Sequence, residues 1–336
     1  MNIEDTELRG RSRTPIVASG QIELRLEVRK PFAADELLSF LAVRAVPGVE
    51  RSGPGWYERS LRLPHGQGTV RLVADSTELD EVTALVTCLL WLCDPRDVSA
   101  AVQRCRRLLD ADRDADRDPV AVDDELSTDP RLAPLVSARP GLRVPGHVDG
   151  NEIAIRAVLG QQVSVGHARV LAGLLVERYG EPLHAIAADS QADPPSEVTH
   201  LFPTAEVLAV VDPEDIPMPR ARGIALNSLC AALASGQIQL DRSADRIDVR
   251  DSLLALPGIG PWTAGYIAMR ALGDPDAFLP TDIGVRNALK LLGEDPKDAE
   301  QLSQAWRPWR SYAQMHLWTS LTPTPVGSPR SRTKEK

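Results

Sequence analysis

The segment Leu256–Gly260, which reads LPGIG, constrains the fold of this chain more than any other. Helical periodicity stands on both sides of it, so the segment is predicted to be the turn of a helix–hairpin–helix. Gly258 and Gly260 can adopt positive φ and carry no Cβ, and Pro261 suits the first turn of a helix. The N–H groups of the region from Gly260 to Thr263 then have no intrahelical acceptor, and a phosphate is a natural partner for such a helix end. A tight pair of helices without a ligand has the same pattern, so both interpretations stand at this point.

Aromatic side chains gather after this turn. Trp262 and Tyr266 are four residues apart and share one face of a predicted helix over residues 262–271. Aromatic residues make up only 4% of the chain, yet the last predicted helix, residues 299–320, adds Trp306, Trp309, Tyr312 and Trp318. We expect Trp306 and Trp309 to be ordinary core residues. For Trp262, Tyr266 and Trp318 two interpretations stand at this point, ordinary core aromatics and a stacking pocket for an electron-poor base.

The other elements predict two kinds of unit. Apolar residues alternate with charged ones over residues 21–28, which indicates a half-buried strand. Further strands are predicted over residues 56–63, 69–74 and 82–91, and helices over residues 34–46 and 97–109. From about Pro130 helix follows helix, over residues 152–163, 165–179, 204–210, 220–235, 252–256, 262–271, 283–292 and 299–320. No run of 18 apolar residues and no export leader is found, so we expect a soluble protein.

The net charge of −9 is unusual for a protein that binds DNA, but most of it is local. Residues 110–129 carry nine acidic residues and two arginines, which leaves the rest of the chain close to neutral. We expect this tract to bury nothing and to be a linker or an exposed loop. DNA would be held through backbone amides and local basic residues, with modest long-range steering.

An acidic residue, Asp282, lies 24 residues after Gly258 and beyond the aromatic helix. Alone, Thr281 or Asp282 is best explained as the N-cap of the next helix. The combination with the hairpin, however, resembles the helix–hairpin–helix DNA glycosylases that have a Gly/Pro-rich loop and a catalytic Asp (HhH-GPD). Within them the chain is most similar to the 3-methyladenine DNA glycosylase II, or AlkA, type. The similarity covers roughly residues 20–320 and rests on the blocks FLAVRAVPGVE, ERSLRL, LRVPGHVDGNEIAIRAVLGQQVSV, LPGIGPWTAGYIAMR, FLPTD and WRPWRSYAQMHLW.

The resemblance implies an α+β N-terminal domain with an antiparallel sheet, TATA-binding-protein-like, followed by a mainly α-helical HhH-GPD glycosylase domain. The expected bounds are residues 17–112 for the sheet domain, 113–129 for the acidic linker and 130–321 for the helical domain, with disordered ends at 1–16 and 322–336. The opening ELRGRSRTP also resembles the end of an AraC-type helical domain, which precedes this enzyme in fusions that carry a methyl-acceptor module.

The resemblance also implies roles for single residues. Asp282 is the expected catalytic residue, and Phe40 is expected to join Trp262, Tyr266 and Trp318 in the base pocket. Gly258, Ile259, Gly260 and Thr263 are expected to contact DNA. Lyase relatives carry a lysine two residues after the second hairpin glycine; this chain has Trp262 there, so we expect a monofunctional enzyme, without strand cleavage.

Three positions depart from the family pattern. Gln162 stands where the residue that fills the gap in the duplex is typically Leu, and we expect it to be a less apolar wedge. Ile283 and Thr319 stand where the type protein has tyrosines, so the pocket is less aromatic. His316 is expected to be structural, while Arg286 and Arg310 are open between phosphate contact and pairing with acids.

No cofactor is expected, apart from a monovalent cation that the family binds at the hairpin, here through the backbone carbonyls of Leu254, Leu256 and Ile259. The four cysteines have no CxxC spacing and are expected to be buried thiols, and the absence of any cysteine after Cys230 excludes an iron–sulfur loop.

The expected partner is double-stranded DNA with alkylated bases, without a membrane, for a monomer in the cytoplasm associated with the nucleoid. Two alternatives remain. One is an oxidised-base glycosylase of the same superfamily, against which the missing lysine argues. The other is a non-catalytic protein that binds damaged DNA, which would need neither Asp282 nor the aromatic face.

Overall fold

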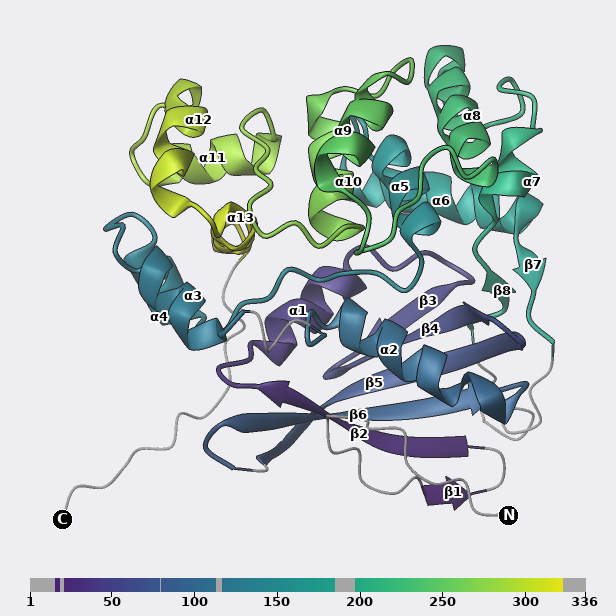
Figure 1. The fold of residues 1–336 in the computed structure, drawn as a ribbon, viewed down its shortest axis with the longest axis horizontal. Helices are drawn as coiled ribbons and strands as arrows, with labels where there is room; N and C mark the ends of the chain where they lie inside the picture. The colour runs from purple at the N-terminus through teal and green to yellow at the C-terminus, as the bar shows by residue number, and fades with distance from the viewer. Residues whose placement is uncertain (1–15, 19–20, 79, 113–116, 185–196, 323–336) are drawn as a thin grey trace.

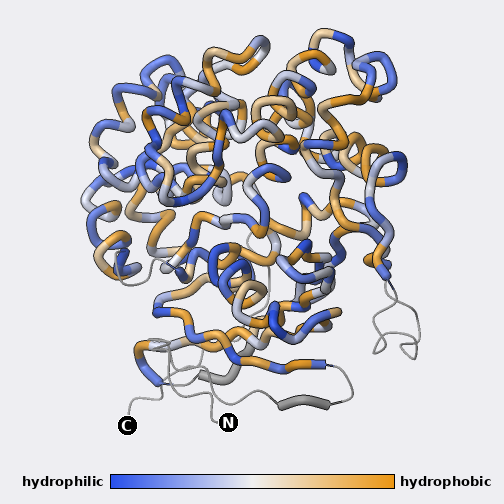
Figure 2. Tube along the Cα trace, turned by 45° about the vertical axis from the view of Figure 1, so that its right-hand side comes forward, coloured by the Kyte–Doolittle hydropathy of each residue, from blue (hydrophilic) through white to orange (hydrophobic). Residues whose placement is uncertain are grey.

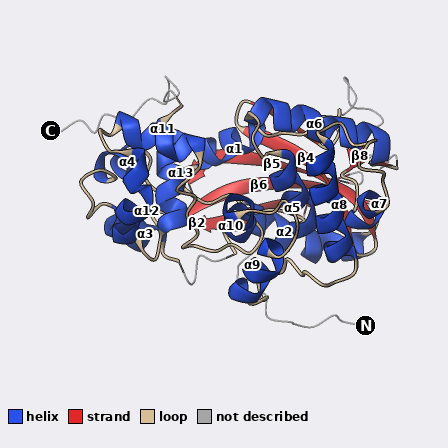
Figure 3. Cartoon of the chain, turned by 90° about the horizontal axis from the view of Figure 1, so that it is seen from above, coloured by secondary structure: helices blue, strands red, loops and turns tan. Residues whose placement is uncertain are grey.

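The computed structural model describes residues 16–18, 21–78, 80–112, 117–184 and 197–322. It has two parts, a twisted sheet with two helices and a larger group of helices stacked above it (Figure 1). Seen from above, helices α2, α5, α8 and α10 lie over the sheet (Figure 3). Among the described residues, no helix is both long and apolar enough to cross a membrane.

The sheet contains β1 (Ile16–Ala18), β2 (Gln21–Arg29), β3 (Glu50–Gly53), β4 (Trp56–Leu63), β5 (Gly66–Glu78) and β6 (Thr83–Leu92). Its order is β1-β2-β6-β5-β4-β3, and every neighbouring pair is antiparallel. The pairing register places Leu24, Cys88, Leu72 and Tyr57 in one row across four strands, and all four side chains are buried. The alternation predicted for residues 21–28 is therefore confirmed, because one face of the sheet forms a core.

Helices α1 (Ala34–Ala42) and α2 (Val98–Leu108) cover this buried face. Leu37 and Leu41 of α1 and Cys105 and Leu108 of α2 are buried in the same core as the strands. Figure 2 shows hydrophobic and hydrophilic stretches along the chain, both in the sheet domain at the bottom of the view and in the helices above it.

The helical part has its own core. Its helices are α3 (Pro119–Leu126), α4 (Ala133–Ala138), α5 (Gly150–Leu159), α6 (Val165–Tyr179), α7 (Ala205–Ala209), α8 (Arg220–Ala234), α9 (Arg246–Leu254), α10 (Pro261–Arg270), α11 (Ile283–Leu291), α12 (Ala299–Leu302) and α13 (Arg310–Ser320). A short ribbon of β7 (Glu181–Pro182) and β8 (His200–Leu201) joins it to the edge of the sheet domain, where the Ser60 hydroxyl donates to the His200 carbonyl at 2.7 Å.

The acidic tract differs from the expectation that it buries nothing. Residues 119–126 form α3, whose Val122 and Leu126 lie in the helical core. Two acids at the ends of the tract are buried as well: Asp110 accepts a hydrogen bond from the Tyr312 hydroxyl at 2.6 Å, and Asp129 accepts one from the Trp306 indole at 2.7 Å. These donors come from nearly 200 residues further along the chain, so a local charge count could not reveal them.

Other differences are local. The single helix predicted over residues 299–320 is broken into α12, a 3₁₀ turn and α13, because Pro308 has no N–H to continue it and Arg307 is extended. Helix α9 begins at Arg246, earlier than predicted, with the Asp245 carboxylate as its N-cap. Cys93 is exposed, unlike the three other cysteines. The predicted disordered ends, 1–16 and 322–336, lie outside the described residues except for Ile16, which begins β1, and Thr322.

Candidate active site

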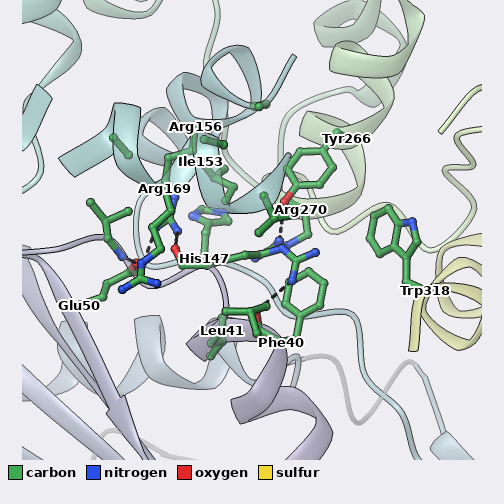
Figure 4. Close-up of a pocket in the computed structure, with 18 of the residues that line it drawn as sticks. Phe40, Leu41, Glu50, His147, Ile153, Arg156, Arg169, Tyr266, Arg270 and Trp318 are labelled. Atoms are coloured by element: carbon green, nitrogen blue, oxygen red, sulfur yellow. Dashed lines mark hydrogen bonds and ion pairs between the residues drawn. The ribbon is translucent and has the colours of Figure 1, made fainter. Parts of the chain in front are cut away.

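A pocket of about 790 Å³ lies between the sheet domain and the helices. Helices α1, α5, α10 and α13 and the loop before α5 contribute its walls (Figure 4). It contains Asp282 and the four aromatic residues predicted as the base pocket: Phe40, Trp262, Tyr266 and Trp318. The pocket therefore brings together Phe40 and Trp318, which are 278 positions apart in the chain.

Asp282 is the N-cap of α11, and its Oδ1 accepts a hydrogen bond from the Val285 amide at 3.0 Å. Two indoles hold the same carboxylate: Trp318 Nε1 donates to Oδ1 at 2.8 Å, and Trp262 Nε1 donates to Oδ2 at 3.0 Å. Asp282 therefore caps α11 and also lines the pocket. With three donors around it, the carboxylate is held in a single orientation at the pocket wall.

Gly284 leaves room for this arrangement. A Cβ at this position would lie 2.9 Å from Trp318 Cδ1 and 3.0 Å from Asp282 Oδ1. Any other residue would have to displace the indole or the carboxylate. The glycine follows Asp282 by two residues, but its role depends on a contact with α13 that the sequence does not show.

The aromatic rings are arranged around an opening. Trp262 and Tyr266 stack at 5.4 Å with an angle of 14°, and Phe40 stacks on Trp318 at 6.2 Å with an angle of 24°. Tyr266 and Trp318 are 6.4 Å apart and tilted by 45°. All four rings are half-buried. The spacing of four residues predicted that Trp262 and Tyr266 share a face, and the structure confirms it.

Two arginines lie behind the aromatic rings, and the sequence interpretation missed them. Arg270 Nη1 donates to the Tyr266 hydroxyl at 2.8 Å, and the Cζ atoms of Arg44 and Arg270 lie 3.6 and 5.0 Å from the centre of the Phe40 ring. A signal was present for Arg270, which is four residues after Tyr266 on α10 and therefore shares its face. Arg44 lies in the turn that follows α1, which ends at Ala42.

A buried ionic network lies below the pocket and joins the two parts of the protein. Arg59 of β4 donates to Glu50 at 3.1 Å and to Glu152 of α5 at 2.6 Å, while Arg156 donates to both carboxylates at 2.9 Å. Burial by itself would raise the pKa of Glu50, but Arg156 and Arg59 lower it to about 2. The network fixes α5 against the sheet, and therefore fixes the floor of the pocket.

The hairpin between α9 and α10 has the predicted geometry. Gly258 has φ +77°, and a Cβ there would lie 2.6 Å from Ala225 Cβ. Glycine is therefore required both by the backbone conformation and by the close contact with Ala225. Gly260 is the N-cap of α10 with extended backbone, and a Cβ there would meet nothing within 4 Å. The fold itself therefore does not require glycine at residue 260. The side chains of Ile259 and Thr263 are buried.

The predicted wedge, Gln162, lies in the loop between α5 and α6, where it is exposed and has φ +56°. Its neighbour Gln161 ties this loop to the hairpin, since Gln161 Nε2 donates to the Gly258 carbonyl and to Thr263 Oγ1, both at 2.9 Å. The loop and the hairpin are therefore held together, although about a hundred residues separate them in the chain.

Several other predicted residues are now placed. Ile283 is 72% exposed at the pocket rim, and Thr319 also lines the pocket. His316 is buried, as expected of a structural residue, and burial lowers its pKa to about 4. Arg310 pairs with Asp276 at 2.7 Å, so it belongs to the fold. Arg286 is exposed on α11.

The monovalent cation remains a prediction. Of its three expected carbonyls, that of Leu256 accepts the Ile259 amide at 3.2 Å, which leaves one lone pair for an ion; the others are those of Leu254 and Ile259. In the described part of the chain, no group of three or more His, Cys, Asp or Glu residues is arranged to hold a metal ion.

The fold is shared with solved DNA glycosylases. The 3-methyladenine DNA glycosylase from Archaeoglobus fulgidus superposes with a TM-score of 0.70 at 18% identity, over 88% of this chain and 96% of that one. The structure of MBOgg1 in complex with a low-affinity DNA ligand gives 0.65, also at 18% identity, over 92% of this chain and 97% of that one.

Sequence comparisons identify the family. Residues 23–149 match the model of the AlkA N-terminal domain. DNA-3-methyladenine glycosylase 2 of Escherichia coli (strain K12) is 32% identical over 313 residues, which cover 87% of this chain and 95% of that protein. The probable bifunctional transcriptional activator/DNA repair enzyme AlkA of Mycobacterium tuberculosis is 47% identical over 307 residues, which cover 90% of this chain. The chain belongs to the AlkA family of DNA-3-methyladenine glycosylases.

The chain matches only 58% of the length of the Mycobacterium tuberculosis protein. The resemblance of the opening residues to an AraC-type domain remains a prediction, because residues 1–15 lie outside the described part of the structure.

Proposed function

We propose that this chain is a monofunctional DNA glycosylase that removes alkylated bases, such as 3-methyladenine and 7-methylguanine, from duplex DNA in base excision repair. The observation that carries the proposal is the fixation of the Asp282 carboxylate by the indoles of Trp262 and Trp318, at 3.0 and 2.8 Å. One pocket thereby combines aromatic rings on which a base can stack with an oriented carboxylate in its wall. A protein that only binds DNA would need neither the aromatic pocket nor the carboxylate.

The reaction follows from this geometry. A base inside a duplex is out of reach, so the nucleotide must rotate out of the stack, at a cost of a few kcal/mol. The base then enters the pocket and stacks on the aromatic rings, which places its sugar beside Asp282. As the bond from C1′ to the base breaks, positive charge develops on the sugar, and a fixed carboxylate stabilises it. Water adds to C1′, and Asp282 orients it as a general base.

The chemistry of the pocket supports hydrolysis without strand cleavage. Cleavage by a lyase requires an amine that forms a Schiff base with C1′. No lysine is present among the residues that line the pocket. At the position where lyase relatives carry lysine, Trp262 instead donates a hydrogen bond to Asp282. This also argues against the alternative of an oxidised-base glycosylase with lyase activity.

The hairpin and the loop of Gln162 are the proposed grip on DNA. The first turn of α10 has no side-chain cap, so its free N–H groups suit a phosphate, and Gly260 leaves space for the DNA backbone to approach. Gln162 is exposed on a loop bound to that hairpin by Gln161. The contacts of Gln161 with the hairpin support the proposal that Gln162 acts as a wedge next to a phosphate bound at α10.

The test is product analysis on methylated duplex DNA. We expect the purified protein to release free 3-methyladenine and 7-methylguanine and to leave an intact strand with abasic sites, which breaks only after alkali is added. Absence of free base would contradict the glycosylase proposal. Strand breaks without alkali, together with a borohydride-trapped adduct between protein and DNA, would contradict the monofunctional mechanism.

A further inference from the structure

The backbone of Gln162 is strained, and its own side chain does not hold it. Its φ of +56° lies in the left-handed region, and among the described residues Asp110 is the only other non-glycine residue with a positive φ. Such a conformation persists where surrounding contacts fix the backbone. The side chain of Gln162 is exposed, so these contacts must come from the rest of the wedge loop, residues 160–164, and from the elements beside it.

The first contact is made by Gln161, whose amide nitrogen joins the wedge loop to two points of the hairpin. It donates to the Gly258 carbonyl in the turn and to Thr263 Oγ1 in the first turn of α10, both at 2.9 Å. The Thr263 side chain is 2% exposed, so this acceptor is fixed in the core. The same turn of α10 carries the free N–H groups proposed to receive a phosphate. One side chain therefore links the phosphate site to the backbone beside Gln162.

The second contact is made by Arg222 of α8. Its Nη2 donates to the carbonyls of Val158 and Leu159, at 3.1 and 2.8 Å, in the last turn of α5 before the wedge loop. The last carbonyls of a helix have no amide partner one turn further on, and a cation there also meets the negative end of the helix dipole. Burial lowers the pKa of Arg222, and no described carboxylate raises it. The guanidinium is therefore committed to the end of α5.

Helix α8 also supports the hairpin. Ala225 follows Arg222 by three residues and shares its face of α8. A Cβ at Gly258 would lie 2.6 Å from Ala225 Cβ, so the hairpin turn packs directly on this face. Figure 1 and Figure 3 show α8 next to α5. The wedge loop, the hairpin and α8 thus form a closed set of contacts, in which each segment touches the other two.

We propose that Gln161 and Arg222 are positioning residues that hold Gln162 at a fixed place relative to a phosphate bound at α10. Docking of the DNA backbone on the hairpin then brings the wedge to the base stack in the same step. A wedge loop that was free in solution would have to be ordered on the DNA, at a cost in conformational entropy. The two residues act through Gln162 and touch neither the base nor the sugar.

This inference rests on the proposed glycosylase activity and on the wedge role of Gln162, and it concerns how the base is turned out of the duplex. It predicts that both residues matter for duplex DNA alone, since a single strand has no gap to be filled. It also predicts that their effect vanishes once the wedge is removed. A purely structural role would affect both kinds of DNA and would persist without the wedge.

The experiment measures single-turnover release of 7-methylguanine from a duplex and from the same strand alone. Gln161→Met keeps the length of the side chain and removes the donor to the hairpin, and Arg222→Met removes the donors to α5. Each change is also combined with Gln162→Gly, which removes the wedge. Gln103→Met, at an exposed position on α2, is the matched control.

We expect Gln161→Met and Arg222→Met each to slow release from the duplex by about tenfold and to leave release from the single strand unchanged. Gln103→Met should change neither rate. In the Gln162→Gly background, neither substitution should slow the duplex reaction by more than roughly a further twofold, because residues that act through one group are not additive.

Losses that multiply in the double variants, equal losses on duplex and single strand, or a wild-type duplex rate in Gln161→Met and Arg222→Met would each overturn the inference. Thermal unfolding identifies a variant that fails to fold, in which case the other variant decides. Release of 7-methylguanine from neither DNA by the wild-type protein would overturn the proposed glycosylase itself, an outcome distinct from the three above.

Discussion

The indole N–H of Trp262 donates to Oδ2 of Asp282 at 3.0 Å, so a wall of the base pocket also orients the carboxylate at the sugar. Trp262 stacks on Tyr266 with its ring and holds Asp282 with its nitrogen. A base that displaces this indole would therefore also move the anion. In the proposed mechanism, binding of the base and stabilisation of the sugar are therefore coupled through Trp262.

The two glycines of the hairpin should respond differently to alanine. Gly258→Ala forces a side chain into φ +77° and against Ala225, so we expect a loss of at least about 2 kcal/mol in the free energy of unfolding. Gly260→Ala meets nothing within 4 Å, and its stability should change by less than about 0.5 kcal/mol. Its affinity for duplex DNA should fall roughly tenfold, because the methyl group stands where the backbone of DNA approaches. Unchanged affinity in Gly260→Ala would mean that DNA does not approach this turn.

The role of Gln162 as a wedge can be separated from catalysis. Gln162→Gly keeps the backbone at φ +56°, which glycine accepts, and removes only the side chain. Without a group to fill the gap in the stack, excision from duplex DNA should slow by about tenfold. Excision from a single strand needs no such filling and should remain as in the wild type. Equal losses on both substrates would show that the loop acts on chemistry instead.

Two buried histidines should make the protein sensitive to acid. Burial lowers the pKa of His147 to about 3 and of His316 to about 4, while the unfolded chain binds protons near its ordinary value of 6.5. The unfolded state therefore takes up more protons as the pH falls below 6.5, and stability is lost by about 1.4 kcal/mol per pH unit for each histidine until the folded pKa is reached. Chemical denaturation between pH 7 and 5 measures this slope. His316→Leu should reduce the slope of the free energy of unfolding against pH. His167→Gln, at an exposed position, should leave this slope unchanged.

The ionic network under the pocket should contribute strongly to stability. Glu152→Gln leaves the buried Arg59 without its closest partner, which lies at 2.6 Å, and should cost about 3–5 kcal/mol in the free energy of unfolding. The matched control is Glu214→Gln, which breaks a pair with Arg220 whose side chains are 70% and 72% exposed. That change should cost less than about 1 kcal/mol. Urea denaturation of both variants gives the comparison, and similar losses would contradict the role assigned to the network.

The parts of the site that local patterns encode could be predicted. The hairpin glycines and the shared face of Trp262 and Tyr266 follow from spacing along a few turns of helix, and the N-cap position of Asp282 follows from the amphipathic helix after it. The alternation of strand β2 likewise gave its buried face. The resemblance then added the expected catalytic role of Asp282 and Phe40, which lies 278 residues before Trp318 in the chain but stacks on it at 6.2 Å.

The parts that were missed depend on contacts between distant segments. The acidic tract was expected to stay exposed, yet Asp110 and Asp129 are buried because Tyr312 and Trp306 reach them from the end of the chain. An unpaired charge would not be buried, but a sequence does not show which charges find a donor. Arg44 and Arg270 were overlooked for a related reason, since arginines are usually solvated.

The central claim is that the Asp282 carboxylate stabilises the sugar during cleavage, and Asp282→Asn tests it most directly. Asparagine retains the shape and the oxygen that accepts from Val285 and Trp318, but its amide nitrogen cannot accept from Trp262 Nε1. We therefore expect a loss of about 1 kcal/mol in the free energy of unfolding and unchanged binding of DNA. The control Asp295→Asn changes an exposed capping acid on the Lys297 amide. The single-turnover rate of 7-methylguanine release should fall on the order of 100-fold or more in Asp282→Asn and remain unchanged in Asp295→Asn. A rate in Asp282→Asn within a few fold of the wild type would show that the carboxylate only caps α11.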